Sequence, residues 1–224
     1  MKVMKMLLGA ALGIAMHLIA FSNLGSGQDV SARSVPKERP PLFFREDWKE
    51  TPAAEPLTQD HVANQNLILG LYGPGKDHMR KSHHDTPADD PFYVWSGLST
   101  GNWAITLRKR DSYVNLTGKS KLRWRTMQTG LRQLHVILKL SDGSWLVSDE
   151  AFGPTTDWRE GEFSFADFHW HALDIKTVVE VKSVEKPDLS KVDEIGWTDL
   201  MTGGSTPASS RVDWIEIYGW SIQR

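Results

Sequence analysis

Apolar and polar side chains alternate most clearly along residues 116–149, with turn residues at Thr129-Gly130 and Ser141–Gly143. A period of two over three consecutive runs predicts three antiparallel β-strands, each with one face on a core. We expect the opposite face to be a single polar surface. Its side chains are Arg123, Arg125, Gln133, His135 and Lys139.

Short apolar or β-branched runs recur through the rest of the chain, bounded by Gly, Pro, Asn and Asp. They predict strands at 42–48, 66–72, 92–95, 102–110, 161–165, 192–200 and 211–220, and one or two more within 170–184. Residues 58–63 fit a short helical turn, and 76–91 form a long irregular loop, a type that is often functional. About ten to twelve short strands with almost no helix predict an all-β sandwich or barrel.

The first residues have the features of a secretory signal peptide. Lys2 and Lys5 precede an apolar run over 6–21, which is near the lower length limit for spanning a bilayer. We therefore expect a secreted or periplasmic protein with no stable membrane insertion after cleavage. The predicted divisions are a signal peptide at 1–27, a flexible leader at 28–41 and one β-sandwich domain at 42–224.

Composition narrows the possible partners and chemistry. Removing residues 1–27 moves the formal charge from −2 to −4, which argues against a nucleic-acid partner. The absence of cysteine excludes disulfides, thiolate catalysis and Cys-ligated zinc. Of the ten tryptophans, we expect six or seven in the core and the rest exposed as platforms for sugar rings. Candidates near loops are Trp95, Trp103, Trp145, Trp158 and Trp220, with Trp145 and Trp158 favoured because each flanks a turn.

Three segments carry a resemblance to a known fold: LTGKSKLRWR at 116–125, DWREGEFSFADF at 157–168, and PDLSKVDEIGWTDL at 187–200 followed by RVDWIEIYG. Their order of strands and turns resembles the galactose-binding-domain-like jelly roll of many carbohydrate-binding modules, and the complex I intermediate-associated domain. The resemblance covers roughly 112–219 and implies a single-domain jelly-roll sandwich that recognises sugars. It also implies a structural Ca²⁺ near the chain ends, for which Glu46, Asp47 and Asp213 are candidate ligands.

The polar face of residues 116–149 has the side chains for either binding or catalysis. Arginine holds carboxylates, and histidine exchanges protons near neutral pH. Gln133-Leu134-His135 resembles the Gln-x-His strand motif of jelly-roll alginate lyases, although the other motifs of that family are missing. If the protein is an enzyme, the candidate catalytic residues are His135, Arg125, Gln133 and Lys139, with Arg123 binding ligand. The alternative is an ordinary solvated sheet face.

Two histidine groups are further candidates for ligand binding. His83, His84 and Asp85 have metal-ligand side chains within the long loop, which is otherwise a polar surface loop or a sugar contact. His169 and His171 flank Trp170, so on a strand both imidazoles share one face. The alternative is that Trp170 points inward and both histidines are simply exposed.

These observations favour a secreted carbohydrate-recognising β-sandwich that binds a polysaccharide or oligosaccharide through a polar, tryptophan-bordered sheet face. The alternatives are a glycan-degrading enzyme, either a polysaccharide lyase or a glycoside hydrolase, and a structural protein of the cell envelope. A polar sheet face that is concave would form a binding groove, whereas a flat one would be an ordinary solvated surface. The sequence does not specify which face is concave.

Overall fold

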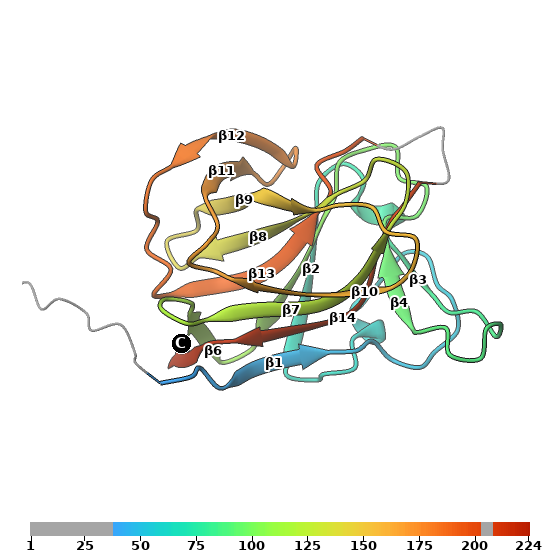
Figure 1. The fold of residues 1–224 in the computed structure, drawn as a ribbon, viewed down its shortest axis with the longest axis horizontal. Coiled ribbons are helices and arrows are strands. Elements are labelled where there is room, and N and C mark those ends of the chain that lie inside the picture. The colour runs from blue at the N-terminus through green and yellow to red at the C-terminus, as the bar shows by residue number, and fades with distance from the viewer. Residues whose placement is uncertain (1–37, 203–207) are drawn as a thin grey trace, which may run out of the picture. The chain divides into compact units, whose positions relative to one another are not determined.

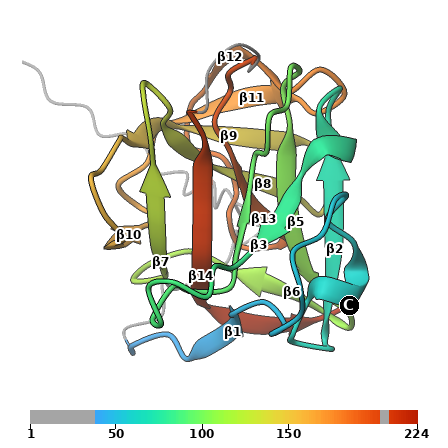
Figure 2. The same ribbon diagram turned by 90° about the vertical axis from the view of Figure 1, so that its right-hand side faces the viewer.

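The computed structural model describes residues 38–202 and 208–224. The predicted signal peptide and most of the predicted leader lie outside the described residues. Fifteen strands and two short 3-10 helices, η1 (Gln59–His61) and η2 (Lys76–His78), make up the regular structure of the described part. The strands form two antiparallel sheets that pack as layers (Figures 1 and 2), which confirms the all-β jelly-roll sandwich.

Sheet A has six strands. In order they are β10 (Arg159–Ser164), β7 (Lys121–Gln128), β14 (Ser210–Tyr218), β4 (Tyr93–Trp95) and β3 (Arg80–Ser82), with β1 (Leu42–Glu46) also paired to β14. Sheet B has nine strands. They are β12 (Val179–Val184), β11 (Trp170–Asp174), β9 (Trp145–Phe152), β8 (Leu134–Leu140), β13 (Val192–Thr198), β5 (Ala104–Lys109) and β2 (Leu67–Tyr72), with β6 (Ser112–Asn115) paired to β13 and β15 (Trp220–Gln223) paired to β6.

The prediction that residues 116–149 form one three-stranded unit is wrong in one respect. β8 and β9 pair as expected, but β7 lies between β10 and β14 in sheet A. The chain therefore crosses from one sheet to the other in the turn after β7. Alternation shows which side chains face the core, but strands of both sheets face the same core, so it does not identify a strand's partner.

The core between the sheets is rich in tryptophan. Six of the ten tryptophans are buried, in agreement with the expected number, and five belong to the main core cluster: Trp48, Trp103, Trp124, Trp170 and Trp197. Trp103 is fully buried, so it is not a sugar platform. The sixth, Trp214, lies on the outer face of sheet A beneath the guanidinium of Arg45, whose Cζ is 4.5 Å from the ring centroid.

The short strands β3, β6 and β15 were not expected from the sequence, and β3 and η2 lie within the stretch predicted to be an irregular loop. Each of these strands has four residues or fewer, which is too short for a periodic pattern to stand out. Within the described residues, no helix has the length and apolar character that crossing a membrane requires.

Candidate functional site

Strand register places four polar or aromatic side chains in one row on the outer face of sheet B. Glu194 on β13 lies opposite Lys139 on β8, which lies opposite Trp145 on β9. Arg108 on β5 follows one position after the last pair of β5 with β13, which brings it beside Glu194. The flanking residues of these strands point into the core, so this row faces outward.

Glu194 organises the row through three hydrogen bonds. Its carboxylate accepts from Lys139 Nζ at 2.9 Å, from the Tyr72 hydroxyl at 2.8 Å and from Thr106 Oγ1 at 2.7 Å. Glu194 is buried beneath these donors, whereas Tyr72, Lys139 and Trp145 are part-exposed. Burial and the neighbouring carboxylate of Glu194 raise the pKa of Tyr72, so its hydroxyl stays a donor.

The outer face of sheet B is concave. Tyr72 is on β2 and Trp145 is on β9, with β5, β13 and β8 between them. Neighbouring strands lie about 4.8 Å apart, so a flat sheet would separate these two strands by roughly 19 Å. The two ring centroids are nevertheless 4.9 Å apart with an interplanar angle of 67°. Two side chains cannot bridge that span across a flat sheet, so the sheet must curve toward the rings.

Gly70 makes room for the Tyr72 ring, and Gly196 makes room for the backbone of β5. A Cβ on Gly70 would lie 2.4 Å from Thr106 Oγ1 and 2.8 Å from the Tyr72 ring. A Cβ on Gly196 would lie 1.9 Å from the carbonyl oxygen of Ile105. Glycine inside a strand commonly marks such close approaches, and here it lets Tyr72 reach across to Glu194.

The turn between β11 and β12 closes part of this concave face. Val178 is fully buried in a small apolar cluster on the outer side of sheet B. The other buried members are Ala104, Ile137, Val147 and Leu173. Asn102 Nδ2 donates to the Val178 carbonyl at 2.8 Å and holds the turn in place. The row of Arg108, Lys139 and Trp145 is left beside this cluster, part-exposed.

Arg108 differs from the other charged members of the row because its side chain has no partner among the described residues. Lys139 is bound to Glu194, and its ammonium also lies 3.6 Å from a carboxylate oxygen of Asp193. Arg108 makes no ion pair within residues 38–202 and 208–224, and it is part-exposed. Its five N–H donors are therefore available to a ligand.

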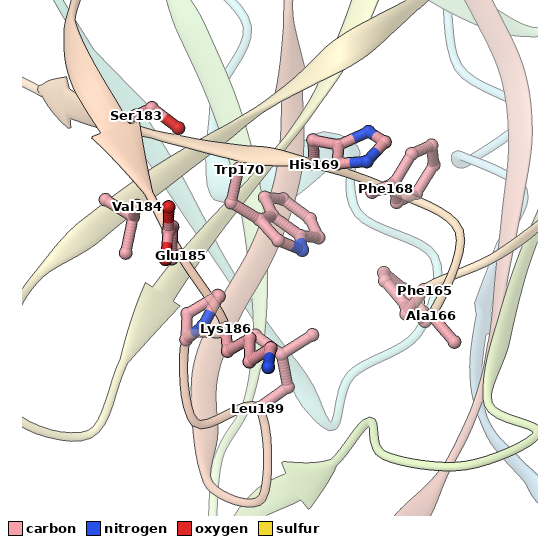
Figure 3. A pocket seen from close by; sticks show the side chains of 11 residues that line it. Phe165, Ala166, Phe168, His169, Trp170, Ser183, Val184, Glu185, Lys186 and Leu189 are labelled. Carbon is pink, nitrogen blue, oxygen red and sulfur yellow. The ribbon is translucent and has the colours of Figure 1, made fainter.

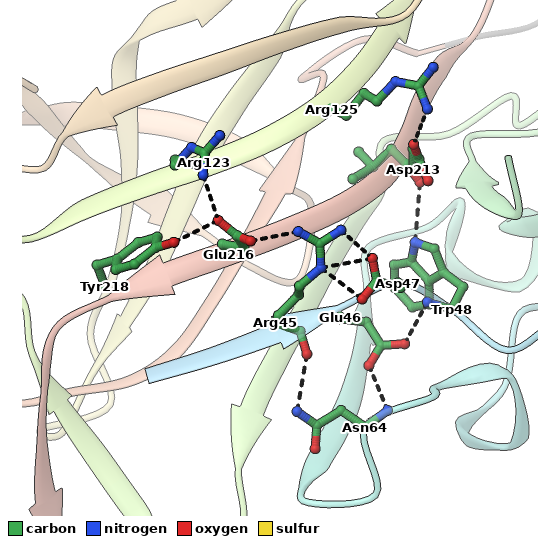
Figure 4. A network of polar contacts seen from close by, with 11 residues as sticks. Arg45, Glu46, Asp47, Trp48, Asn64, Arg123, Arg125, Asp213, Glu216 and Tyr218 are labelled. Atoms are coloured by element: carbon green, nitrogen blue, oxygen red, sulfur yellow. Dashed lines mark hydrogen bonds and ion pairs between the residues drawn. The ribbon is translucent and has the colours of Figure 1, made fainter. Parts of the chain in front are cut away.

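The predicted arginines Arg123 and Arg125 lie on the outer face of sheet A, in a network of ion pairs (Figure 4). Arg123 Nη1 is 3.2 Å from Glu216, and Arg125 Nη1 is 2.8 Å from Asp213. Arg45 completes the network with Glu216 at 2.5 Å. Each guanidinium here already has a carboxylate from a neighbouring strand.

The three candidate calcium ligands have separate protein partners. The buried Glu46 accepts hydrogen bonds from the backbone N–H groups of Trp48, Ala63 and Asn64 at 2.9, 2.7 and 3.0 Å. Asp47 pairs with Arg45, and Asp213 with Arg125. Burial raises the pKa of Asp213 to about 6. No group of three metal-ligand side chains lies together in the described part of the chain.

The four residues proposed for catalysis do not share one surface. Arg125 is on sheet A, whereas His135 and Lys139 are on sheet B. Gln133 is exposed in the turn before β8, and the His135 Nδ1 lies 2.9 Å from the Ser148 carbonyl oxygen. The expectation of one polar face is therefore corrected, since the chain changes sheets between Arg125 and Gln133.

The two histidines of the histidine-rich loop, His83 and His84, both contact Asp90 of the same loop. The ring of His83 stacks on Phe92 with centroids 4.0 Å apart, and His84 Nδ1 lies 3.0 Å from an Asp90 carboxylate oxygen. Asp85 is exposed. The loop adjoins sheet A through the ring of Tyr93, which lies 6.2 Å from the ring of His84.

Trp170 points inward and lines a pocket of about 450 Å³ (Figure 3). Its apolar wall is made of Phe165, Phe168, Trp170, Val184, Pro187 and Leu189. His169 and His171 lie beside different carboxylates, at 3.2 Å from Asp149 and 2.6 Å from Glu180. The structure therefore gives the two imidazoles separate partners and agrees with the alternative in which Trp170 is buried.

Sequence reasoning found Lys139 and Trp145 but missed Tyr72, Arg108 and Glu194. The sequence signal for Glu194 is its position directly before the apolar residues Ile195, Gly196 and Trp197. A charge that is buried beside such residues needs hydrogen-bonding partners. Tyr72 ends one strand that the pattern predicted, and Arg108 lies near the end of another. Nothing local links either of them to Trp145.

The structure defines an all-β, two-sheet sandwich with one concave aromatic face. No protein-family model matches the sequence, and no curated protein matches it. Solved structures that resemble it are carbohydrate-binding modules, the class named by the sequence resemblance. A family 11 module from Clostridium thermocellum, in complex with a β-1,3-1,4-mixed-linked tetrasaccharide, is 16% identical over 78% of this chain and 96% of that chain, with a TM-score of 0.46. A family 29 module from Piromyces equi is 13% identical over 80% and 89%, with a TM-score of 0.43. Similarity at this level carries no argument about what this chain binds.

Proposed function

We propose that the protein binds a glycan on the concave face of sheet B. Trp145 and Tyr72 are the ring contacts, and Arg108 and Lys139 are the hydrogen-bond donors. The observation that carries the proposal is the pair of part-exposed rings 4.9 Å apart, above the hydrogen-bonded Glu194 and Lys139. Sugar rings present C–H groups to aromatic faces and hydroxyl oxygens to cationic donors, which is the combination found here.

Within this site Glu194 has a positioning role. Its oxygens are already taken by Tyr72, Thr106 and Lys139, so it holds donors and rings in place and has little capacity left for a ligand. A surface that is ordered before binding loses less conformational entropy when the ligand arrives. Arg108 has no such internal partner among the described residues and supplies the free donors.

We further infer that the protein works outside the cytoplasm, as a secreted or periplasmic protein. The features of residues 1–27 support this inference, and a polysaccharide or oligosaccharide partner is consistent with it. Fractionation of the expressing cells, with mass spectrometry of the N-terminus of the exported protein, tests it. Recovery of an uncleaved chain in the cytoplasm would contradict it.

The test of the main proposal is calorimetric titration against a panel of neutral polysaccharides and oligosaccharides. We expect Trp145→Ala to weaken binding by roughly 30-fold, since a central aromatic contact contributes about 2 kcal/mol. Arg108→Ala should also weaken it. Trp220→Ala is the matched control, because Trp220 is part-exposed but lies on β15, which pairs with β6 and with no strand of the row.

Two results contradict the proposal: no binding to any glycan of the panel, or binding that is unchanged in both Trp145→Ala and Arg108→Ala. The same mixtures are assayed for new reducing ends, and parallel mixtures with uronate-containing glycans are assayed for unsaturated uronates. Turnover of a bound glycan would favour the enzyme alternative over pure binding.

A further inference from the structure

A second aromatic cluster lies on the outer face of sheet A, away from the concave face of sheet B. Arg211 on β14 is paired with Trp95 on β4 and with Met127 on β7. Trp158 immediately precedes β10, whose first residue pairs with Thr126, so Trp158 lies beside Met127. The register therefore sets Arg211 in one row with Trp95 next to it on one side and Trp158 beyond Met127 on the other.

Both indole rings of this row have guanidinium neighbours, and the Cζ of Arg125 lies 5.5 Å from the Trp158 ring centroid. The Cζ of Arg211 lies 6.0 Å from the Trp95 ring centroid, on a ring that Arg80 also covers at 5.6 Å. On the other side, the Tyr93 ring lies 5.3 Å from the Trp158 ring. Tyr93 is buried and forms the base of the cluster, while Trp95 and Trp158 are part-exposed.

Arg211 has no carboxylate partner among the described residues. The neighbouring arginines do, since Arg80 pairs with Glu55, and Arg125 pairs with Asp213 at 2.8 Å. The nearby Asp90 pairs with His84 at 3.0 Å. Arg211 is thus part-exposed, and its guanidinium lies against the Trp95 ring. No carboxylate among the described residues accepts from its N–H groups.

We propose that Arg211, flanked by Trp95 and Trp158, is a second binding site and takes the carboxylate of a uronate unit in an acidic glycan. The guanidinium fork matches a carboxylate bidentately, and the part-exposed indoles offer faces for the sugar ring. Charge complementarity selects an anionic unit, because this guanidinium is the one in the row without an internal carboxylate. The proposal does not depend on the concave face of sheet B, since the two sites are on different sheets.

The experiment is calorimetric titration of the full chain with de-esterified oligogalacturonate, and with the same oligomer as its neutral methyl ester. We expect the acid form to bind and the ester not to bind. Arg211→Ala should weaken binding of the acid form by roughly 10- to 100-fold, the range for hydrogen bonds to a charged group. Arg211→Lys should restore only part of the affinity, because an ammonium cannot match both carboxylate oxygens.

Two controls separate this site from charge in general and from the concave face. Arg110→Ala removes an exposed guanidinium next to β5 in sheet B, whose Nε donates to the Gln65 carbonyl. Arg110→Ala should not alter binding of the acid form, and the loss caused by Arg211→Ala should be the same in a Trp145→Ala background. Trp95→Ala should weaken it, and circular dichroism with a thermal melt confirms that the Arg211 variants are folded.

Three outcomes overturn the proposal. The first is an acid form that does not bind, or that binds as well to folded Arg211→Ala as to the wild type. The second is an equal loss of binding in Arg110→Ala, which would show that only net charge matters. The third is a sulfated oligosaccharide of equal charge density that binds as tightly with the same dependence on Arg211, which would show that the site does not select carboxylates.

Discussion

Replacing Asp213 by Asn should make the protein more stable at neutral pH, although it removes one partner of an ion pair. Asp213 lies at an irregularity in β14 and is 7% exposed. Burial raises the pKa of its carboxyl to about 6, against the hydrogen bond and charge of Arg125, and the nearby Asp47 adds to the rise. The ionised form is therefore the less favourable one in the folded protein.

The sign and size of the stability change follow from the pKa of Asp213 in the unfolded and the folded state. The carboxyl titrates at 3.8 when unfolded and at about 6 when folded, so the folded state binds the proton more tightly. This group stabilises the fold below about pH 4, and that contribution is lost as the pH rises toward and through 6. A difference of roughly two pH units corresponds to about 3 kcal/mol above pH 6. Asparagine imitates the protonated form at every pH, and its amide oxygen still accepts from Arg125.

Urea unfolding followed by tryptophan fluorescence, at several pH values between about 4 and 8, measures the effect. We expect the free energy of unfolding of Asp213→Asn to exceed that of the wild type by up to about 3 kcal/mol near pH 8. Near pH 4 the two free energies should differ little. Asp167→Asn is the control, because Asp167 is exposed in the turn after β10. A stability difference that does not change with pH, or a variant that is less stable than wild type near pH 8, would refute the reasoning.

Two further predictions concern the packing of the concave face. Gly196→Ala should destabilise the fold by roughly 3 kcal/mol, because its Cβ meets backbone that cannot move aside, whereas Gly153→Ala, with open space around it, should be neutral in the same urea assay. Glu194→Ala should cost roughly 3 kcal/mol because Tyr72, Thr106 and the part-buried Lys139 lose their shared acceptor. Glu194→Gln should recover most of that loss, and a Gln variant as unstable as the Ala variant would contradict this account.

The sequence pattern was sufficient for most strands and for the side of each strand that is buried. Along β7 the alternation of Leu122 and Trp124 with Arg123 and Arg125 appears in the structure as predicted. The pattern failed at the next step, the assignment of strands to sheets. β7 and β8 bury equivalent positions in one core from opposite sides, so their local sequences are alike although their outer faces point in opposite directions.

The candidate site was only half predictable for a related reason. Lys139 and Trp145 are neighbours across a hairpin, and their proximity follows from short-range sequence. Tyr72 reaches the same place only because sheet B curves and because Gly70 leaves space for its ring. Curvature is a property of the whole sheet, so no local run of residues specifies it.

The arginines show most directly why residue type alone does not locate a binding surface. Arg123 and Arg125 are conspicuous in the sequence, but each is paired with a carboxylate that lies 93 or 88 residues away along the chain. Their donors stabilise β14 against β7. Arg108 and Arg211 are inconspicuous in the sequence, and each is part-exposed without a carboxylate partner in the described residues. Long-range pairing therefore decides which guanidinium groups are held by carboxylates, and it leaves Arg108 on sheet B and Arg211 on sheet A without one among the described residues.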